Sequence, residues 1–113
     1  TCEIKPVFHY ESNGGQTGVK NVTCGDVINL FAGSITTSVT PNFTCKDQTG
    51  KDCPGSSISV IIKKPDNTTQ VLTGPTYNYI YSLTMPGTYE YTITAICGGK
   101  DCVCKFQVVI PQH

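Results

Sequence analysis

Seven cysteines are the residues of this sequence with the clearest chemical potential. They are Cys2, Cys24, Cys45, Cys53, Cys97, Cys102 and Cys104. So many thiols in 113 residues indicate disulfide bonds formed in an oxidising compartment. Zinc is the alternative, but the run Cys97–Cys104 lacks the paired C-x-x-C spacing of a structural zinc site, and the two histidines stand near the chain ends. We therefore expect disulfides, no metal, no cofactor, and a secreted, extracellular protein associated with the cell surface.

Groups that could catalyse a reaction are sparse. His9 stands between two aromatic residues in an expected first strand, which is typical of a surface or edge position, and His113 is the last residue. The eight acidic residues are scattered mostly over turns and loops, so no carboxylate pair is placed for glycoside hydrolysis. Gly14-Gly15 is not followed by the Lys-Ser/Thr of a phosphate-binding loop. We predict that the chain is not an enzyme.

Charge and hydropathy exclude two classes of partner. Lysines balance Asp plus Glu at eight each, and arginine is absent, so the charge gives no reason to expect nucleic acid or an anionic membrane as partner. No apolar run reaches the roughly 18 residues of a membrane span, so we expect no membrane insertion. The sequence opens at Thr1-Cys2 without a signal peptide, as in a mature product or an excised module.

Three loop aspartates raise the question of calcium. Asp47, Asp52 and Asp101 fall in loops expected at one end of the domain, and loop carboxylates are ligands that Ca²⁺ prefers. No Asp-x-Asp-x-Asp spacing is present, which favours solvated turn residues over a calcium site.

Tyr77, Tyr79 and Tyr81 form the most suggestive surface pattern. At period two they share one face of a strand, and a tyrosine offers an apolar plate for stacking on a sugar ring and a hydroxyl for hydrogen bonding. The strip is thus a tentative ligand-binding site for polysaccharide. The alternative is that the three rings pack in the core between sheets, since tyrosine is intermediate in its tendency to be buried.

Three Asn-x-Ser/Thr triplets, at Asn21, Asn42 and Asn67, are possible glycosylation sites. Such triplets also arise by chance in a chain rich in threonine and asparagine. They matter only if the host glycosylates its exported proteins.

Period-two alternation predicts strands rather than helices. Ile58, Val60 and Ile62 alternate with serines, and Tyr89, Tyr91 and Ile93 alternate with polar residues. Asn13-Gly14-Gly15, Pro65-Asp66-Asn67, Gly74-Pro75 and Pro86-Gly87 supply turns. The expected strands are 4–11, 26–32, 35–41, 57–64, 69–73, 77–83, 88–97 and 102–110. This pattern indicates an all-β fold, with residues 1–113 forming one antiparallel β-sandwich of seven or eight strands stapled by disulfides.

The run Met85-Pro86-Gly87-Thr88-Tyr89-Glu90-Tyr91, feeding an alternating strand, resembles the penultimate strand of PKD-type and related immunoglobulin-like repeats of large secreted bacterial or archaeal surface proteins. Residues 97–104 are similar to cysteine-bearing versions in Bacteroidetes proteins, and residues 23–30 resemble the turn that opens strand B. The aromatic Asp-Phe-Gly-Asp-Gly stretch of PKD repeats is absent. The resemblance implies an immunoglobulin-like sandwich, and in it Tyr89 resembles the tyrosine whose hydroxyl caps the turn before its strand.

An immunoglobulin-like order sorts the cysteines by end of the sandwich. It gathers Cys2, Cys45, Cys53, Cys97, Cys102 and Cys104 at one pole, which leaves Cys24 alone at the other as the odd or intermolecular cysteine. We hypothesise that Cys45 pairs with Cys53 across their short loop, and that Cys97 pairs with Cys102 or Cys104.

Three functions remain open from the sequence. The first is a non-catalytic extracellular module that acts in adhesion or as a structural spacer beside other surface domains. The second is a carbohydrate-binding module that presents the tyrosine strip. The third is a self-assembling filament or surface-layer subunit, motivated by Cys24 and by apolar strands at both ends of the chain.

Overall fold

The computed structural model describes residues 2–46, 49–51, 55–73, 78–97 and 100–112. Within these ranges every regular element is a strand, and no helix is present that could cross a membrane. The strands are β1 Cys2–Ile4, β2 Val7–Ser12, β3 Thr17–Asn21, β4 Val27–Asn29, β5 Ile35–Thr40, β6 Phe43–Cys45, β7 Gly55–Lys63, β8 Thr69–Thr73, β9 Tyr79–Leu83, β10 Gly87–Cys97 and β11 Lys100–Ile110. The prediction of an all-β fold is confirmed, with more strands than expected.

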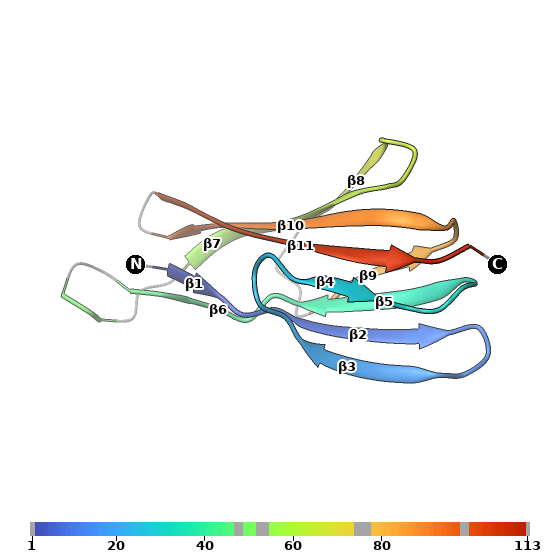
Figure 1. Cartoon of the computed structure of the whole chain (residues 1–113). Coiled ribbons are helices and arrows are strands. Elements are labelled where there is room, and N and C mark those ends of the chain that lie inside the picture. Colours follow the sequence, from blue (N-terminus) through green and yellow to red (C-terminus); the bar gives the residue numbers. More distant parts are fainter. Residues whose placement is uncertain (1, 47–48, 52–54, 74–77, 98–99, 113) are drawn as a thin grey trace.

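The strands form three sheets (Figure 1). A five-stranded sheet has the order β4-β11-β10-β7-β8, a four-stranded sheet has the order β3-β2-β5-β9, and β1 pairs with β6 alone. Each described pairing is antiparallel except that of β4 with β11, which is parallel. The two larger sheets lie over each other as the layers of a β-sandwich. That its topology is immunoglobulin-like stays a prediction.

Alternation along β10 and β11 builds one half of the core. Tyr89, Tyr91 and Ile93 of β10 are buried, and so are Phe106 and Val108 of β11, while the residues between them are exposed or half-buried. The two strands pair over their whole length, with Tyr91 opposite Phe106. The period-two pattern of the sequence therefore selects the inner face of this sheet correctly.

Aromatic rings join the two layers. Phe8 of β2 meets Tyr91 and Phe106 edge-on, with ring centroids 5.9 Å apart in both pairs. Tyr91 and Phe106 in turn stack on each other at 5.0 Å. Because Phe8 belongs to the four-stranded sheet and the other two rings to the five-stranded sheet, this cluster fixes the packing of one layer against the other.

The turn between β9 and β10 is closed by a tyrosine. The Tyr89 hydroxyl donates to the Met85 carbonyl oxygen at 2.7 Å and accepts from the Met85 amide at 3.1 Å. The predicted capping role of Tyr89 is confirmed. Burial raises the pKa of Tyr89 above its ordinary value.

The molecule is elongated, with principal extents of 51 × 26 × 23 Å. The start of β1 and the end of β11 lie toward opposite ends of the long axis (Figure 1). At the amino-terminal end the β1–β6 pair faces the β10–β11 hairpin, where the hairpin extends beyond the body of the sandwich. This end of the molecule holds most of the cysteines.

Candidate functional site

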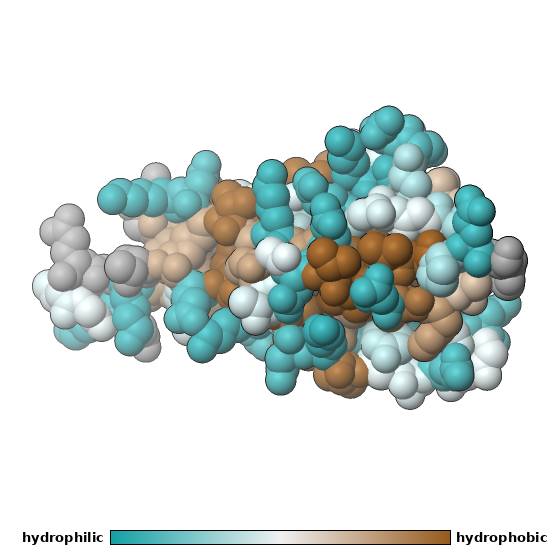
Figure 2. Space-filling model, viewed as in Figure 1, coloured by the Kyte–Doolittle hydropathy of each residue, from teal (hydrophilic) through white to brown (hydrophobic). Residues whose placement is uncertain are grey.

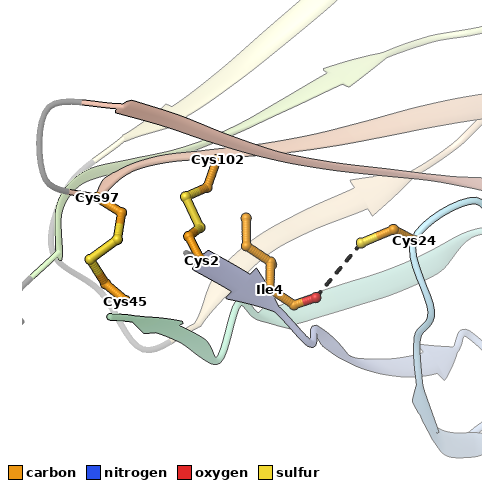
Figure 3. Close-up of a disulfide and its surroundings, with 6 residues drawn as sticks. All are labelled: Cys2, Ile4, Cys24, Cys45, Cys97 and Cys102. Carbon is orange, nitrogen blue, oxygen red and sulfur yellow. Dashed lines mark hydrogen bonds between the residues drawn. A yellow bond between two sulfur atoms is a disulfide. The ribbon is translucent and has the colours of Figure 1, made fainter. Parts of the chain in front are cut away.

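Four cysteines gather where the β1–β6 pair faces the β10–β11 hairpin, and we call this group (Cys2, Cys45, Cys97 and Cys102) the cysteine pole. Cys2 and Cys45 lie directly opposite each other in the β1–β6 register. On the hairpin, Cys97 belongs to β10 and Cys102 to β11, and both side chains are buried. Two pairs of sulfur atoms therefore face each other across the end of the sandwich (Figure 3).

Two disulfides cross this gap. Cys2 is bonded to Cys102 with a Cα–Cα distance of 6.2 Å, and Cys45 is bonded to Cys97 with a Cα–Cα distance of 5.5 Å. Both bonds run from the β1–β6 pair to the hairpin and fasten the two together (Figure 3). Loops of this length give disulfides a stabilising effect of about 4–5 kcal/mol each in the chain-entropy account.

The predicted pairing of the cysteines is wrong. Cys45 is bonded to Cys97 and not to Cys53, which lies outside the described residues. Cys97 does not pair along its hairpin, because the residue directly opposite Cys102 is Ala95 and the residue opposite Cys97 is Lys100. The two cysteines are thus diagonal neighbours, whose Cα atoms are roughly 7–8 Å apart, beyond the usual reach of a disulfide.

Cys24 is not the odd cysteine. It is bonded to Cys104 with a Cα–Cα distance of 5.2 Å. The turn that precedes β4 lies beside β11, where the Gly25 amide donates to the Lys105 carbonyl oxygen, and this brings Cys24 to Cys104. The Cys24 sulfur also lies 3.7 Å from the Ile4 carbonyl oxygen (Figure 3), a contact that would be a hydrogen bond only for a free thiol.

The bonds account for six of the seven cysteines of the sequence, and Cys53 is the seventh. Cys53 lies outside the described residues. Three disulfides also indicate that the protein folds in a non-reducing environment.

The cysteine pole also has the spacing of a metal site. The sulfur atoms of Cys2, Cys97 and Cys102 lie within 4.8 Å of one another. Zinc requires thiolates, however, and each of these sulfurs is already bonded to another sulfur. Disulfide formation and metal binding are alternative states of the same atoms, and the geometry here is that of the disulfides.

The tyrosine strip is not an exposed platform. Tyr79 is buried, and Leu83 on the same face of β9 is buried too. Tyr81 is half-buried at the margin, where the Lys64 ammonium lies 5.6 Å from its ring centroid, and Tyr77 is outside the described residues. This face of β9 packs onto the core, so the outward face carries Asn78, Ile80 and Ser82 instead.

The three glycosylation triplets are all accessible. Asn21 ends β3, Asn42 lies between β5 and β6, and Asn67 lies in the β7–β8 turn with a positive φ of 70°, and each side chain is exposed. Asn21 and Asn42 line a groove of about 930 Å³ together with parts of β1, β2 and β6. The only charged residues of the groove, Glu3 and Lys5, form an exposed ion pair at 3.1 Å.

Of the groups considered for catalysis or calcium binding, the structure describes His9 and Asp101, and both are exposed. His9 is exposed on β2, His113 lies outside the described residues, and so do Asp47 and Asp52 of the calcium alternative. The pKa values that do shift belong to structural contacts. The Thr68 hydroxyl and amide lower the pKa of Asp66 in the β7–β8 turn, and the nearby Tyr81 hydroxyl raises the pKa of Lys64.

Five large apolar side chains of the described residues are exposed. Val19 on β3, Val27 on β4, Val71 on β8, Ile80 on β9 and Val103 on β11 are exposed. On the face in Figure 2, apolar atoms gather around β4 and are surrounded by polar ones. Four of the five residues lie on the edge strands of the two larger sheets.

Comparison with protein-family models and with curated proteins finds no match for this chain.

Proposed function

We propose that this chain is a non-catalytic extracellular module that acts as a structural spacer in a secreted or cell-surface protein. The single observation that carries the proposal is the shape of the domain. It is a rod 51 Å long in which β1 starts toward one end and β11 finishes toward the other (Figure 1). Modules joined in series through such ends add their lengths, which is what a spacer requires.

The disulfides support the extracellular part of the proposal. Three bonds in a small domain are typical of proteins that work where no reducing system maintains thiols. Exposure of Asn21, Asn42 and Asn67 is compatible with glycans at all three positions, because no packed side chain would have to move. The resemblance of residues 85–110 to immunoglobulin-like repeats of surface proteins points in the same direction.

A tandem of two copies, joined from residue 113 to residue 1, tests the spacer function. Small-angle scattering should give a maximum dimension of about 100 Å, since two rods of 51 Å in series double the length. A tandem that folds back to a dimension near that of one copy would contradict the proposal. Sedimentation velocity of the single copy provides the control, because a spacer should remain a monomer.

Self-association is the second candidate, and β9 is the observation that favours it. This edge strand contains no charged residue, and its outward Ile80 is 63% exposed. At the other edge of the same sheet, Val19 is also exposed, but Lys20 follows it and discourages pairing. A concentration-dependent dimer that Ile80→Lys abolishes, and that Val19→Lys leaves intact, would favour a subunit of an assembly over a spacer.

A further inference from the structure

The Cys2–Cys102 disulfide provides a short covalent path between the two ends of the rod. It connects the first described residue to β11, and β11 runs without interruption to Ile110 at the other end (Figures 1 and 3). We propose that this bond makes the domain inextensible, so that tension applied through its ends is transmitted without lengthening even when the fold is lost. The inference rests on the proposed function, since a spacer is pulled through its ends.

The length of the path can be worked out from the structure. It consists of the disulfide, with a Cα–Cα distance of 6.2 Å, and of β11 from Cys102 to Ile110. A strand already rises about 3.3 Å per residue, and a fully stretched chain reaches about 3.6 Å per residue. Complete unfolding therefore lengthens the path from Cys2 to Ile110 by only about 2–3 Å.

Residues 3–101 lie outside this path. Tension that enters at Cys2 passes through the sulfur atoms to Cys102, and from there along the backbone of β11. The hydrogen bonds of β11 with β10 and β4 lie beside the path rather than in series with it. The core can therefore open while the distance between the ends grows by less than about 10 Å.

The other two disulfides do not replace this bond. With Cys24–Cys104 as the shortest remaining link, the path includes residues 2–24 and 104–110, and unfolding lengthens it by about 70 Å. With no disulfide, the chain between Cys2 and Ile110 lengthens by about 340 Å. Removal of Cys45–Cys97 alone leaves the short path intact.

Single-molecule stretching between handles at residues 1 and 113 tests the proposal. The oxidised protein should show no unfolding step above about 10 Å in contour length. Cys2→Ser/Cys102→Ser should give a step of about 70 Å, and the matched control Cys45→Ser/Cys97→Ser should give none. A step of tens of ångströms in the oxidised wild type or in the control would overturn the proposal.

A fold that resists force would also show no step, so the oxidised protein is stretched again in about 6 M guanidinium chloride, which unfolds it. Loss of the far-ultraviolet β signal in bulk verifies unfolding. The tether should keep its contour length within about 10 Å, and adding a reductant under force should then release steps that total about 340 Å. This arm uses the wild type alone and does not depend on whether the variants fold.

The two proposals fail in different ways. A tandem that folds back, combined with an oxidised domain that does not lengthen, would refute the spacer function and leave the covalent path standing. A tandem of about twice 51 Å whose oxidised domains lengthen under force would refute the covalent path and leave the spacer function standing.

Discussion

Replacing Thr37 by valine should destabilise the fold far more than the small change in side-chain volume suggests. Thr37 is a fully buried polar residue on β5. Its Oγ1 lies 2.8 Å from the Tyr81 carbonyl oxygen and 2.8 Å from the Tyr91 hydroxyl. Because a carbonyl can only accept, the single Thr37 proton goes to Tyr81, and Tyr91 must donate to the Thr37 oxygen.

The direction of these two hydrogen bonds determines how much stability each substitution should cost. Thr37→Val keeps the shape but leaves the buried Tyr91 hydroxyl without an acceptor and the Tyr81 carbonyl without that donor, at a cost of about 2–4 kcal/mol. Tyr91→Phe leaves the Thr37–Tyr81 bond in place and costs about 0.5–1.5 kcal/mol. In the double variant the unsatisfied tyrosine hydroxyl is gone, so its cost should be about 1–2 kcal/mol less than the sum of the single costs.

Guanidinium unfolding of the oxidised proteins at neutral pH, followed by far-ultraviolet circular dichroism, measures these free energies. The slope of free energy against denaturant should be the same for all four proteins, so that the midpoints report stability. A Thr37→Val cost below about 0.5 kcal/mol, or strictly additive single costs, would refute the chain of hydrogen bonds.

Three further predictions concern pH, a turn and the cysteines. Burial raises the pKa of both Tyr91 and Tyr89, so the unfolded state loses these two protons at a lower pH than the folded state does. The free energy of unfolding should therefore be constant below the unfolded tyrosine pKa of about 10 and should fall above it. Unfolding measured with thiols blocked should show a less steep fall in Tyr91→Phe. Gly87 has a φ of 127°, and a Cβ there would lie 2.6 Å from the Pro65 ring. Gly87→Ala should therefore lower the free energy of unfolding by about 3 kcal/mol, and the exposed-turn control Gly14→Ala should lower it by less than about 0.5 kcal/mol. Equal losses of stability in the two variants would contradict this. Alkylation of the denatured, non-reduced protein should find no more than one free thiol per chain, at Cys53, and two or more would contradict the pairing.

Much of the sandwich follows from local pattern. Alternation at Tyr89, Tyr91 and Ile93 identifies both the strand and its inner face, because a side chain two residues on returns to the same side. The alternation does not identify the short strands. β6 has only three residues, and β3 contains Gly18, over which the Tyr10 ring lies, so neither shows a pattern that distinguishes it from a loop.

The site was harder to predict because it depends on which strands are neighbours. The sequence places Tyr79 and Tyr81 on one face of a strand, but only the packing of the sheets shows that this face is the inner one. Likewise, nothing local to Cys24 shows that β4, which follows it, pairs in parallel with β11. The pairing of strands far apart in the sequence determines which cysteines meet, and the spacing of the cysteines along the chain does not predict that pairing.

The central claim is the Cys2–Cys102 bond, and peptide mapping of the non-reduced protein tests it most directly. Trypsin leaves Cys102 and Cys104 together in the peptide Asp101–Lys105, and Cys24 and Cys45 together in the peptide Asn21–Lys46. Fragmentation within both peptides must therefore assign each link. We predict that Cys102 is joined to the peptide that contains Cys2, and Cys104 to the peptide that contains Cys24. A link from Cys102 to Cys97, or Cys2 recovered as a free thiol, would contradict the account.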